Sequence, residues 1–247
     1  MEKIVTVEQG LNKLLGKLEI AVPRYKIVRG GRDDFCDTLE WSGKRIPVLW
    51  WRFHEKYGAM KNFLTGENPG TVCGINVYSF TTVEESLTRL LYRELDIAEW
   101  LLGSQTKKVT AFRTGDAMNA IAVMRNGTVA NLELGATMPQ GAMPQCQHRV
   151  LTTSGMTSDR AVDTVTVQSA VYVFAGDPKP DVYTDLESWL YGLSPDDTDA
   201  VMFLLAVMRG EADGDGFAAA DAHLKAAVKA ACDSADQERT CEVEEKL

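Results

Sequence analysis

The sequence predicts an α+β fold, with a large open-faced, mostly antiparallel mixed sheet that carries helices on one face. Three strand-like segments follow one another at 107–114, 117–125 and 128–135, and strands joined by short turns favour antiparallel pairing. The segment 83–103 has the apolar spacing of a long amphipathic helix. Strands and helices interleave elsewhere along the chain, which predicts helices layered against the sheet.

The chain before residue 83 alternates between helical and strand-like periods. Residues 5–19 have helical spacing, and Thr6 with Gln9 can form a capping box at the start of that helix. Helical spacing returns at 54–65. Strands are predicted at segments rich in β-branched and aromatic residues, which are 25–28, 38–41, 46–51 and 72–80.

The predicted helix 83–103 carries two stripes at steps of three and four residues. Glu94 falls beside the apolar stripe, where a carboxylate needs a buried hydrogen bond or an ion partner. Gly103 predicts the end of the helix. The apolar stripe consists of Leu87, Leu91, Leu95, Ala98 and Leu102, and the opposite stripe of Arg89, Arg93, Asp96 and Trp100.

After the helix, Asn126 and Gly127 form the strongest short hairpin signal in the chain. The Met- and Pro-containing segment 136–147 is interpreted as a long connection, with a lid or partner-binding loop as the alternative. Strands are predicted at 149–153 and 161–174, with Pro178 and Pro180 ending the sheet, and helices at 185–192, 196–210 and 218–233, with a flexible acidic turn at 213–216.

Composition and charge argue against several classes of protein, namely nucleic-acid-binding, membrane-spanning and exported proteins. The 247 residues are 45% hydrophobic and carry a net charge of −9, which argues against generic nucleic-acid binding. No apolar run reaches the ~20 residues that span a bilayer, and the N-terminus has no signal-peptide pattern. The five scattered cysteines lack C-x-x-C spacing, which argues against a zinc site or a disulfide framework. We therefore expect a cytoplasmic protein with reduced thiols.

Several motifs in order resemble the C-terminal domain of the Gfo/Idh/MocA oxidoreductases, relatives of glucose–fructose oxidoreductase and inositol dehydrogenase. The resemblance covers about residues 48–247 and implies that fold, with oligomerisation through the open sheet face. The matching segments are Trp51-Arg-Phe53, the glycines at 66 and 70 before Val72, Asp96-Ile-Ala-Glu-Trp-Leu-Leu-Gly103, Lys108–Ala111, Asn126–Ala130 and the closing segment 227–244.

The same resemblance exposes departures from the family pattern. Arg93 stands where the family carries its acid–base histidine, while Asp96 is retained. An arginine stays protonated, so it cannot shuttle a proton from a substrate hydroxyl. The family's nicotinamide-binding Rossmann domain has no counterpart motif, because no strand–Gly-rich turn–helix pattern is present. Glu2 and Lys3 resemble the start of the family's E-K-P motif.

These observations predict two regions: residues 1–45, an N-terminal extension that is a candidate remnant of the end of a Rossmann domain, and residues 46–247, the family-like domain. No cofactor is expected unless a partner chain supplies NAD or NADP. Candidate ligand- or partner-binding residues are Arg52, His54, Arg89, Arg93, Asp96 and Trp100. The guanidinium groups of Arg89 and Arg93 could bind one anion together, or the stripe could be a solvated face. His54 could reach the same binding site, or it could lie at the surface or cap a helix.

Three functions remain open. The first is a non-catalytic, oligomeric binding or scaffolding subunit, a pseudoenzyme of the family. The second is the substrate-binding half of a split NAD(P)-dependent sugar or polyol oxidoreductase, with a separate Rossmann chain as partner. The third is a protein that binds an anionic metabolite such as a sugar phosphate on the arginine stripe. In all three, the chain alone is not expected to be a dehydrogenase.

Overall fold

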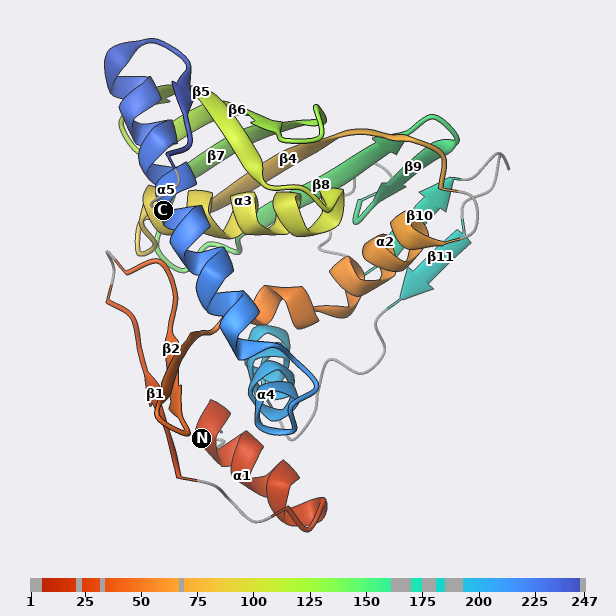
Figure 1. The fold of residues 1–247 in the computed structure, drawn as a ribbon, viewed down its shortest axis with the longest axis vertical. Coiled ribbons are helices and arrows are strands. Elements are labelled where there is room, and N and C mark those ends of the chain that lie inside the picture. Colours follow the sequence, from red (N-terminus) through yellow and green to blue (C-terminus); the bar gives the residue numbers. More distant parts are fainter. Residues whose placement is uncertain are drawn as a thin grey trace.

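The computed structural model describes residues 6–20, 24–31, 34–66, 69–160, 170–174, 181–184 and 193–244. Within these residues the chain forms a small sheet, a large sheet and five α-helices (Figure 1). The helices are α1 (Val7–Lys17), α2 (Glu55–Thr65), α3 (Leu87–Leu102), α4 (Pro195–Met208) and α5 (Gly214–Gln237), with a 3-10 turn, η1, at Trp50–Phe53. None of the described helices combines the length and the apolar composition that crossing a membrane requires.

The large sheet joins nine described strands in the order β11-β10-β9-β8-β4-β7-β6-β5-β12. Its strands are β4 (Val72–Thr82), β5 (Thr106–Thr114), β6 (Ala117–Met124), β7 (Val129–Met138), β8 (Gln145–Thr152), β9 (Gly155–Ser158), β10 (Ala170–Phe174), β11 (Asp181–Thr184) and β12 (Cys241–Glu242). Only β4 and β7 pair in parallel among these strands. The predicted mostly antiparallel mixed sheet is therefore confirmed.

Helices α3 and α5 lie on one face of this sheet, and α3 runs under β4 and β7 (Figure 1). The apolar stripe of α3 is fully buried, with Leu91 and Leu95 at 0% exposure. These residues join the inward side chains of the strands, such as Ile75 and Leu132, in one core. The helix begins at the N-cap Ser86 and ends at Gly103, whose φ of 64° is the left-handed value that glycine adopts without strain.

The N-terminal segment forms a separate three-stranded sheet of β1 (Tyr25–Val28), β2 (Thr38–Trp41) and β3 (Lys44–Pro47). Helix α1 packs against α4, and β3 packs against α5. The predicted capping box of Thr6 and Gln9 is present. Leu39 is fully buried in the same core cluster as α3, so this segment shares its interior with the remainder of the described chain.

Two predicted elements differ from the observed ones in where they begin or end, and in each case one residue is the cause. The strand expected at 46–51 ends at Pro47, which has no N–H for the ladder, and η1 follows. The flexible turn expected at 213–216 is instead the start of α5, because the Asp213 carboxylate accepts the N–H of Asp215 as an N-cap.

Three further predictions concern the edge of the sheet. The long connection expected at 136–147 is shorter, because β7 runs to Met138 and β8 begins at Gln145. The short strand β9 was not predicted, and β11 lies after Pro178 and Pro180, so these prolines do not end the sheet. The predictions for residues 161–169 and 185–192 lie outside the described residues.

Candidate functional site

Helix α3 is buried on nearly every side, and its charged residues therefore need partners inside the protein. Glu94, Asp96 and Glu99 are 1%, 0% and 8% exposed. A buried charge is costly unless it is paired and hydrogen-bonded. The interpretation of the Arg89–Arg93–Asp96 stripe as a solvated face does not hold for Asp96, which is 0% exposed, whereas the Arg89 and Arg93 side chains are 28% and 22% exposed.

Glu94 is the centre of a polar cluster between α3 and β8. One carboxylate oxygen accepts hydrogen bonds from Ser79 Oγ at 2.9 Å and from Arg93 Nε at 3.0 Å, and the other lies 2.7 Å from His148 Nε2. The buried partner expected for Glu94 is confirmed. Burial alone would raise the pKa of Glu94, but Arg93 and His148 outweigh it and hold the pKa at about 2.

His148 is held between two carboxylates. Its Nδ1 lies 2.8 Å from Asp159 Oδ2, and its backbone N–H donates to Asp159 Oδ1 at 2.6 Å. Burial alone would lower the pKa of His148, but Asp159 and Glu94 outweigh it and raise the pKa to about 10. The ring is therefore an imidazolium at neutral pH, and each ring N–H donates to one carboxylate.

Helix α2 contributes a lysine and a tyrosine to the same cluster. Lys56 Nζ lies 3.3 Å from Asp159 Oδ2 and 3.4 Å from Cys146 Sγ, and 4.6 Å from the centre of the Tyr57 ring. The Tyr57 hydroxyl is 3.4 Å from His148 Nδ1. Three cations, from Lys56, Arg93 and His148, thus surround the buried carboxylates of Glu94 and Asp159.

Arg93 is bound by acids of the chain itself. Its guanidinium lies 3.4 Å from Glu85 Oε1, in addition to the contact with Glu94. Burial alone would lower the pKa of Arg93, but Glu94 and Glu85 raise it above the ordinary arginine value. Arg93 does not pair with Asp96, three residues further along α3, because that carboxylate is bound by Trp51 and Arg52 of η1.

Asp96 is the buried anchor of η1. Trp51 Nε1 donates to Asp96 Oδ2 at 2.6 Å and Arg52 Nε donates to the same oxygen at 2.9 Å, while Arg52 Nη2 donates to the other oxygen. The predicted residues Arg52 and Asp96 therefore meet, as an ion pair with 18% and 0% side-chain exposure.

Arg89 contacts a different part of the chain. Its guanidinium lies 3.7 Å from Asp37 Oδ1 and 3.4 Å from the Gly31 carbonyl oxygen, at the connection between β1 and β2. Arg89 and Arg93 thus bind separate carboxylates of the protein instead of forming one fork for an external anion. The joint anion site stays a prediction, and these contacts lend it no support.

The other two candidate residues lie at helix ends. His54 precedes α2 as its N-cap residue, and its ring packs edge-on against Tyr57 with centroids 5.6 Å apart. Its Nδ1 is 3.9 Å from Asp199 Oδ2. Trp100 lies in the last turn of α3, where its carbonyl accepts a hydrogen bond from Lys61. The structure places neither of them in the cluster around His148.

Sequence reasoning missed the main members of this cluster, which are Lys56, Tyr57, Cys146, His148 and Asp159. The one available signal was the Cys146-x-His148 spacing on a strand, because residues two apart point to the same face. A second buried pair was also missed, since His223 Nε2 of α5 lies 3.1 Å from Glu99 Oε1. The contacts join α2, α3, β8 and the end of β9, so no local spacing could reveal them.

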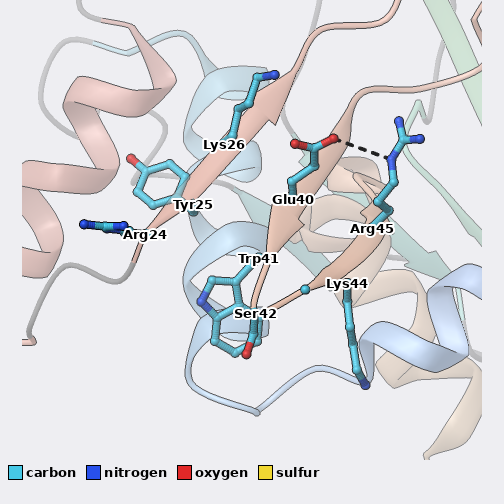
Figure 2. A pocket seen from close by; sticks show the side chains of 9 residues that line it. Arg24, Tyr25, Lys26, Glu40, Trp41, Ser42, Lys44 and Arg45 are labelled. Atoms are coloured by element: carbon cyan, nitrogen blue, oxygen red, sulfur yellow. Dashed lines mark ion pairs between the residues drawn. The ribbon is translucent and has the colours of Figure 1, made fainter.

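Two concave hollows lie on the small sheet, and none of the six candidate residues lines either of them. The first has a volume of ≈ 410 Å³ and is lined by Tyr25, Trp41 and several charged side chains (Figure 2). In it, Glu40 lies 3.6 Å from Arg45. The second has a volume of ≈ 340 Å³ and lies between the small sheet and α5. Neither adjoins a strand–Gly-rich turn–helix unit among the described residues, so neither resembles a dinucleotide site.

The pKa values of the cluster predict how stability depends on pH. The stabilisation from His148 is complete below its unfolded pKa of about 6.5 and is lost as the pH rises toward its folded pKa. The stabilisation from Glu94 is lost as the pH falls from the unfolded pKa of about 4.3 toward the lower pKa that Glu94 has in the folded protein. We expect the free energy of unfolding to fall by about 2 kcal/mol between about pH 7 and pH 8.5, measured by urea denaturation in EDTA.

The matched control for this pH dependence is His148→Gln, which removes the titrating ring and should flatten the slope above about pH 6.5. The two proteins are compared at each pH, so that titration of other groups, such as the cysteines, cancels. An equal slope in both proteins would mean that His148 does not carry a proton in the folded state.

Comparison with known proteins shows that the fold of this chain is similar to that of several solved oxidoreductases. No protein-family model and no curated protein sequence matches the chain. A levoglucosan dehydrogenase in complex with NADH and levoglucosan superposes with a TM-score of 0.63 at 14% identity, over 79% of this chain and 65% of that one. An oxidoreductase from Agrobacterium radiobacter, in complex with NAD+, L-tartaric acid and magnesium, gives a TM-score of 0.62 at 16% identity, over 80% and 64%.

GenD2 from gentamicin A biosynthesis, in complex with NAD, gives a TM-score of 0.57 at 17% identity, over 80% of this chain and 63% of that one. The chain therefore spans less than two thirds of the length of these solved neighbours. Identities of this size establish a common fold and nothing finer. Over about four fifths of its length, this chain has the α+β fold of the Gfo/Idh/MocA-type oxidoreductases.

Proposed function

We propose that this chain transfers no hydride on its own and serves as an oligomeric binding subunit that self-associates through the open face of its large sheet. The observation that carries this proposal is the state of Arg93. It stands where the resemblance places an acid–base histidine, and it is bound by Glu85 and Glu94. A general acid–base group needs a pKa near the working pH, whereas these acids push the pKa of Arg93 upward.

The open sheet face supplies the surface for self-association. Outward side chains on four neighbouring or near-neighbouring strands are large, apolar and exposed: Leu151 on β8 at 38%, Tyr78 on β4 at 45%, Ile121 on β6 at 46% and Phe112 on β5 at 62%. Helices α3 and α5 lie on the opposite face of the sheet (Figure 1). Exposed apolar groups gathered on one face favour an interaction surface.

Polar side chains lie beside these apolar residues on the same face, at paired positions of neighbouring strands. Tyr78 pairs across the sheet with Gln147 on β8 and Glu133 on β7, and Asn76 pairs with Asn131, whose amide donates to it at 3.0 Å. A mixture of aromatic residues with hydrogen-bonding groups is typical of an interface core with a polar rim.

We expect Ile121→Asp to convert a dimer into a monomer, because it places a charge at the centre of an apolar contact. Light scattering coupled to size-exclusion chromatography measures the mass. Val83→Asp is the matched control, since Val83 is equally exposed at 48% but lies outside the sheet, just before α3, and it should leave the dimer intact. A monomeric natural protein, or an Ile121→Asp dimer, would contradict this surface.

The catalytic half of the proposal is tested separately. The purified chain is incubated with NAD+ or NADP+ and a panel of sugars and polyols, and the absorbance of the reduced nicotinamide is followed. We expect no increase above the rate without protein. Reduction that depends on this chain alone would overturn the proposal, whatever the oligomeric state.

A second candidate is the substrate-binding half of a split oxidoreductase. It is favoured by the span of the chain, which covers 65% of a levoglucosan dehydrogenase that binds NADH. In this reading a separate Rossmann chain supplies NAD or NADP. Affinity purification from the native cell separates the two candidates: recovery of a stoichiometric nucleotide-binding chain supports the split enzyme, and recovery of the chain alone supports the homo-oligomeric subunit.

A further inference from the structure

Three side chains that commonly bind metals meet at β8 and the end of β9. One ligand atom each of Cys146, His148 and Asp159 lies within 4.8 Å of the other two. Cys146 and His148 are two residues apart on β8 and so share one face of the strand. Asp159 follows β9, which pairs with β8, and its N–H donates to the His148 carbonyl at 3.2 Å. Two paired strands hold these ligands at fixed spacing.

The environment of His148 is that of a metal-binding histidine. Its Nε2 lies 2.7 Å from Glu94 Oε2, and Glu94 is itself fixed by Ser79 and Arg93. Histidines that bind metals characteristically donate their other ring N–H to a carboxylate, which fixes the ring orientation. This contact leaves Nδ1 on the side of Asp159.

A cation already occupies the space beside these ligands. The Lys56 ammonium lies 3.3 Å from Asp159 Oδ2 and 3.4 Å from Cys146 Sγ. The Lys56 side chain is 12% exposed and starts from the first turn of α2. The four-carbon stem is flexible, and an ion at these ligands requires the ammonium to turn away from them.

We propose that Cys146 Sγ, His148 Nδ1 and Asp159 Oδ2 bind a divalent transition-metal ion, with Zn²⁺ the best fit, in place of the Lys56 ammonium. A thiolate and an imidazole select Zn²⁺ over Mg²⁺ or Ca²⁺, which prefer oxygen ligands. Three protein ligands leave the fourth tetrahedral position for water or another small ligand. Binding releases the thiol proton and the Nδ1 proton to solvent, and His148 Nδ1 and Asp159 Oδ2, now 2.8 Å apart, must separate to admit the ion.

The proposal departs from the expectation, drawn from cysteine spacing, that argued against a zinc site. That expectation considered only C-x-x-C pairs, whereas the third ligand here is 11 residues from His148 and lies just after the following strand. The proposal does not depend on the oligomeric role of the chain, and neither outcome of the nicotinamide assay affects it.

The test is titration of the full chain with Co²⁺, which reports thiolate ligation by a sulfur-to-metal charge-transfer absorption. We expect one Co²⁺ per chain, displaced by Zn²⁺. Cys146→Ser should abolish the absorption, and Cys73→Ser, which changes an exposed thiol on β4, should retain it. Lys56→Met, which removes the competing ammonium, should bind Co²⁺ at least tenfold more tightly.

A second measurement needs no variant. Zn²⁺ should protect Cys146 from iodoacetamide while Cys73 reacts at its normal rate, as read by peptide mass spectrometry. The absence of a charge-transfer band in the natural chain would overturn the proposal, as would a band that survives Cys146→Ser. Binding by Lys56→Met alone would also overturn it, because the ammonium would then hold the site permanently.

Discussion

Replacing Glu94 by Gln is expected to lower the free energy of unfolding by about 3–5 kcal/mol, the range for removing one partner of a buried ion pair. The carboxylate accepts hydrogen bonds from Ser79 and Arg93 and contacts His148, all in an environment with 1% exposure. A neutral amide leaves the positive charges of Arg93 and His148 with less compensation. Chemical denaturation at about pH 6, below the unfolded pKa of His148, measures the loss.

The matched control is Glu244→Gln, which makes the same chemical change at an exposed position near the C-terminus and should alter stability by less than about 0.5 kcal/mol. An NMR titration adds a readout that loss of packing would not give. In the Glu94→Gln protein the pKa of His148 should fall from its raised value toward 6.5, since one of its two carboxylate partners is gone. An unchanged pKa of His148 would contradict the assigned pairing.

Replacing Asp96 by Asn is expected to cost about 3 kcal/mol or more, because it leaves the Arg52 guanidinium largely buried without its counter-charge. Asp96 accepts hydrogen bonds from Arg52 and from Trp51, so the substitution should also loosen η1. The measurement is thermal and urea unfolding. Asp116→Asn, at a carboxylate with 57% exposure, is the control.

A double-mutant cycle separates the ion pair from the packing. Arg52→Met alone leaves the Asp96 carboxylate uncompensated, whereas Arg52→Met with Asp96→Asn removes both charges. We expect the double variant to be more stable than the sum of the two single losses predicts, by at least about 1 kcal/mol. Strict additivity would mean that Arg52 and Asp96 do not interact in solution.

The local elements of this fold could be predicted from the sequence because their signals are local. The capping box at Thr6, the glycine stop at Gly103 and the Asn126-Gly127 hairpin all depend on residues within four positions of one another, and all three are present. The mostly antiparallel sheet followed from three consecutive strands. The errors at Pro47 and Asp213 concern the ends of elements, where one residue decides whether a ladder or a helix continues.

The polar cluster could not be predicted in the same way. Tyr57 and His148 are 91 residues apart, and Glu94 and His148 are 54 apart, so their contact depends on the pairing of β4 with β8. Helical spacing correctly placed Glu94 beside an apolar face, which identified that a partner must exist but not which residue it is. For the same reason the spacing of the arginine stripe could not reveal Asp37 and Glu85, the partners of Arg89 and Arg93, which lie outside the helix.

The parallel pairing of β4 with β7 constrains the order in which the sheet can assemble. Strand β4 comes first among the strands of the large sheet, yet its neighbours β7 and β8 are both encoded later, after α3 and the β5–β6 hairpin. The hairpins β5–β6–β7 need only local contacts, which form quickly, whereas β4 must wait for loop closure over long stretches of chain. During synthesis on the ribosome, the pairing of β4 with its second neighbour therefore cannot be complete until Thr152, the last residue of β8, has emerged.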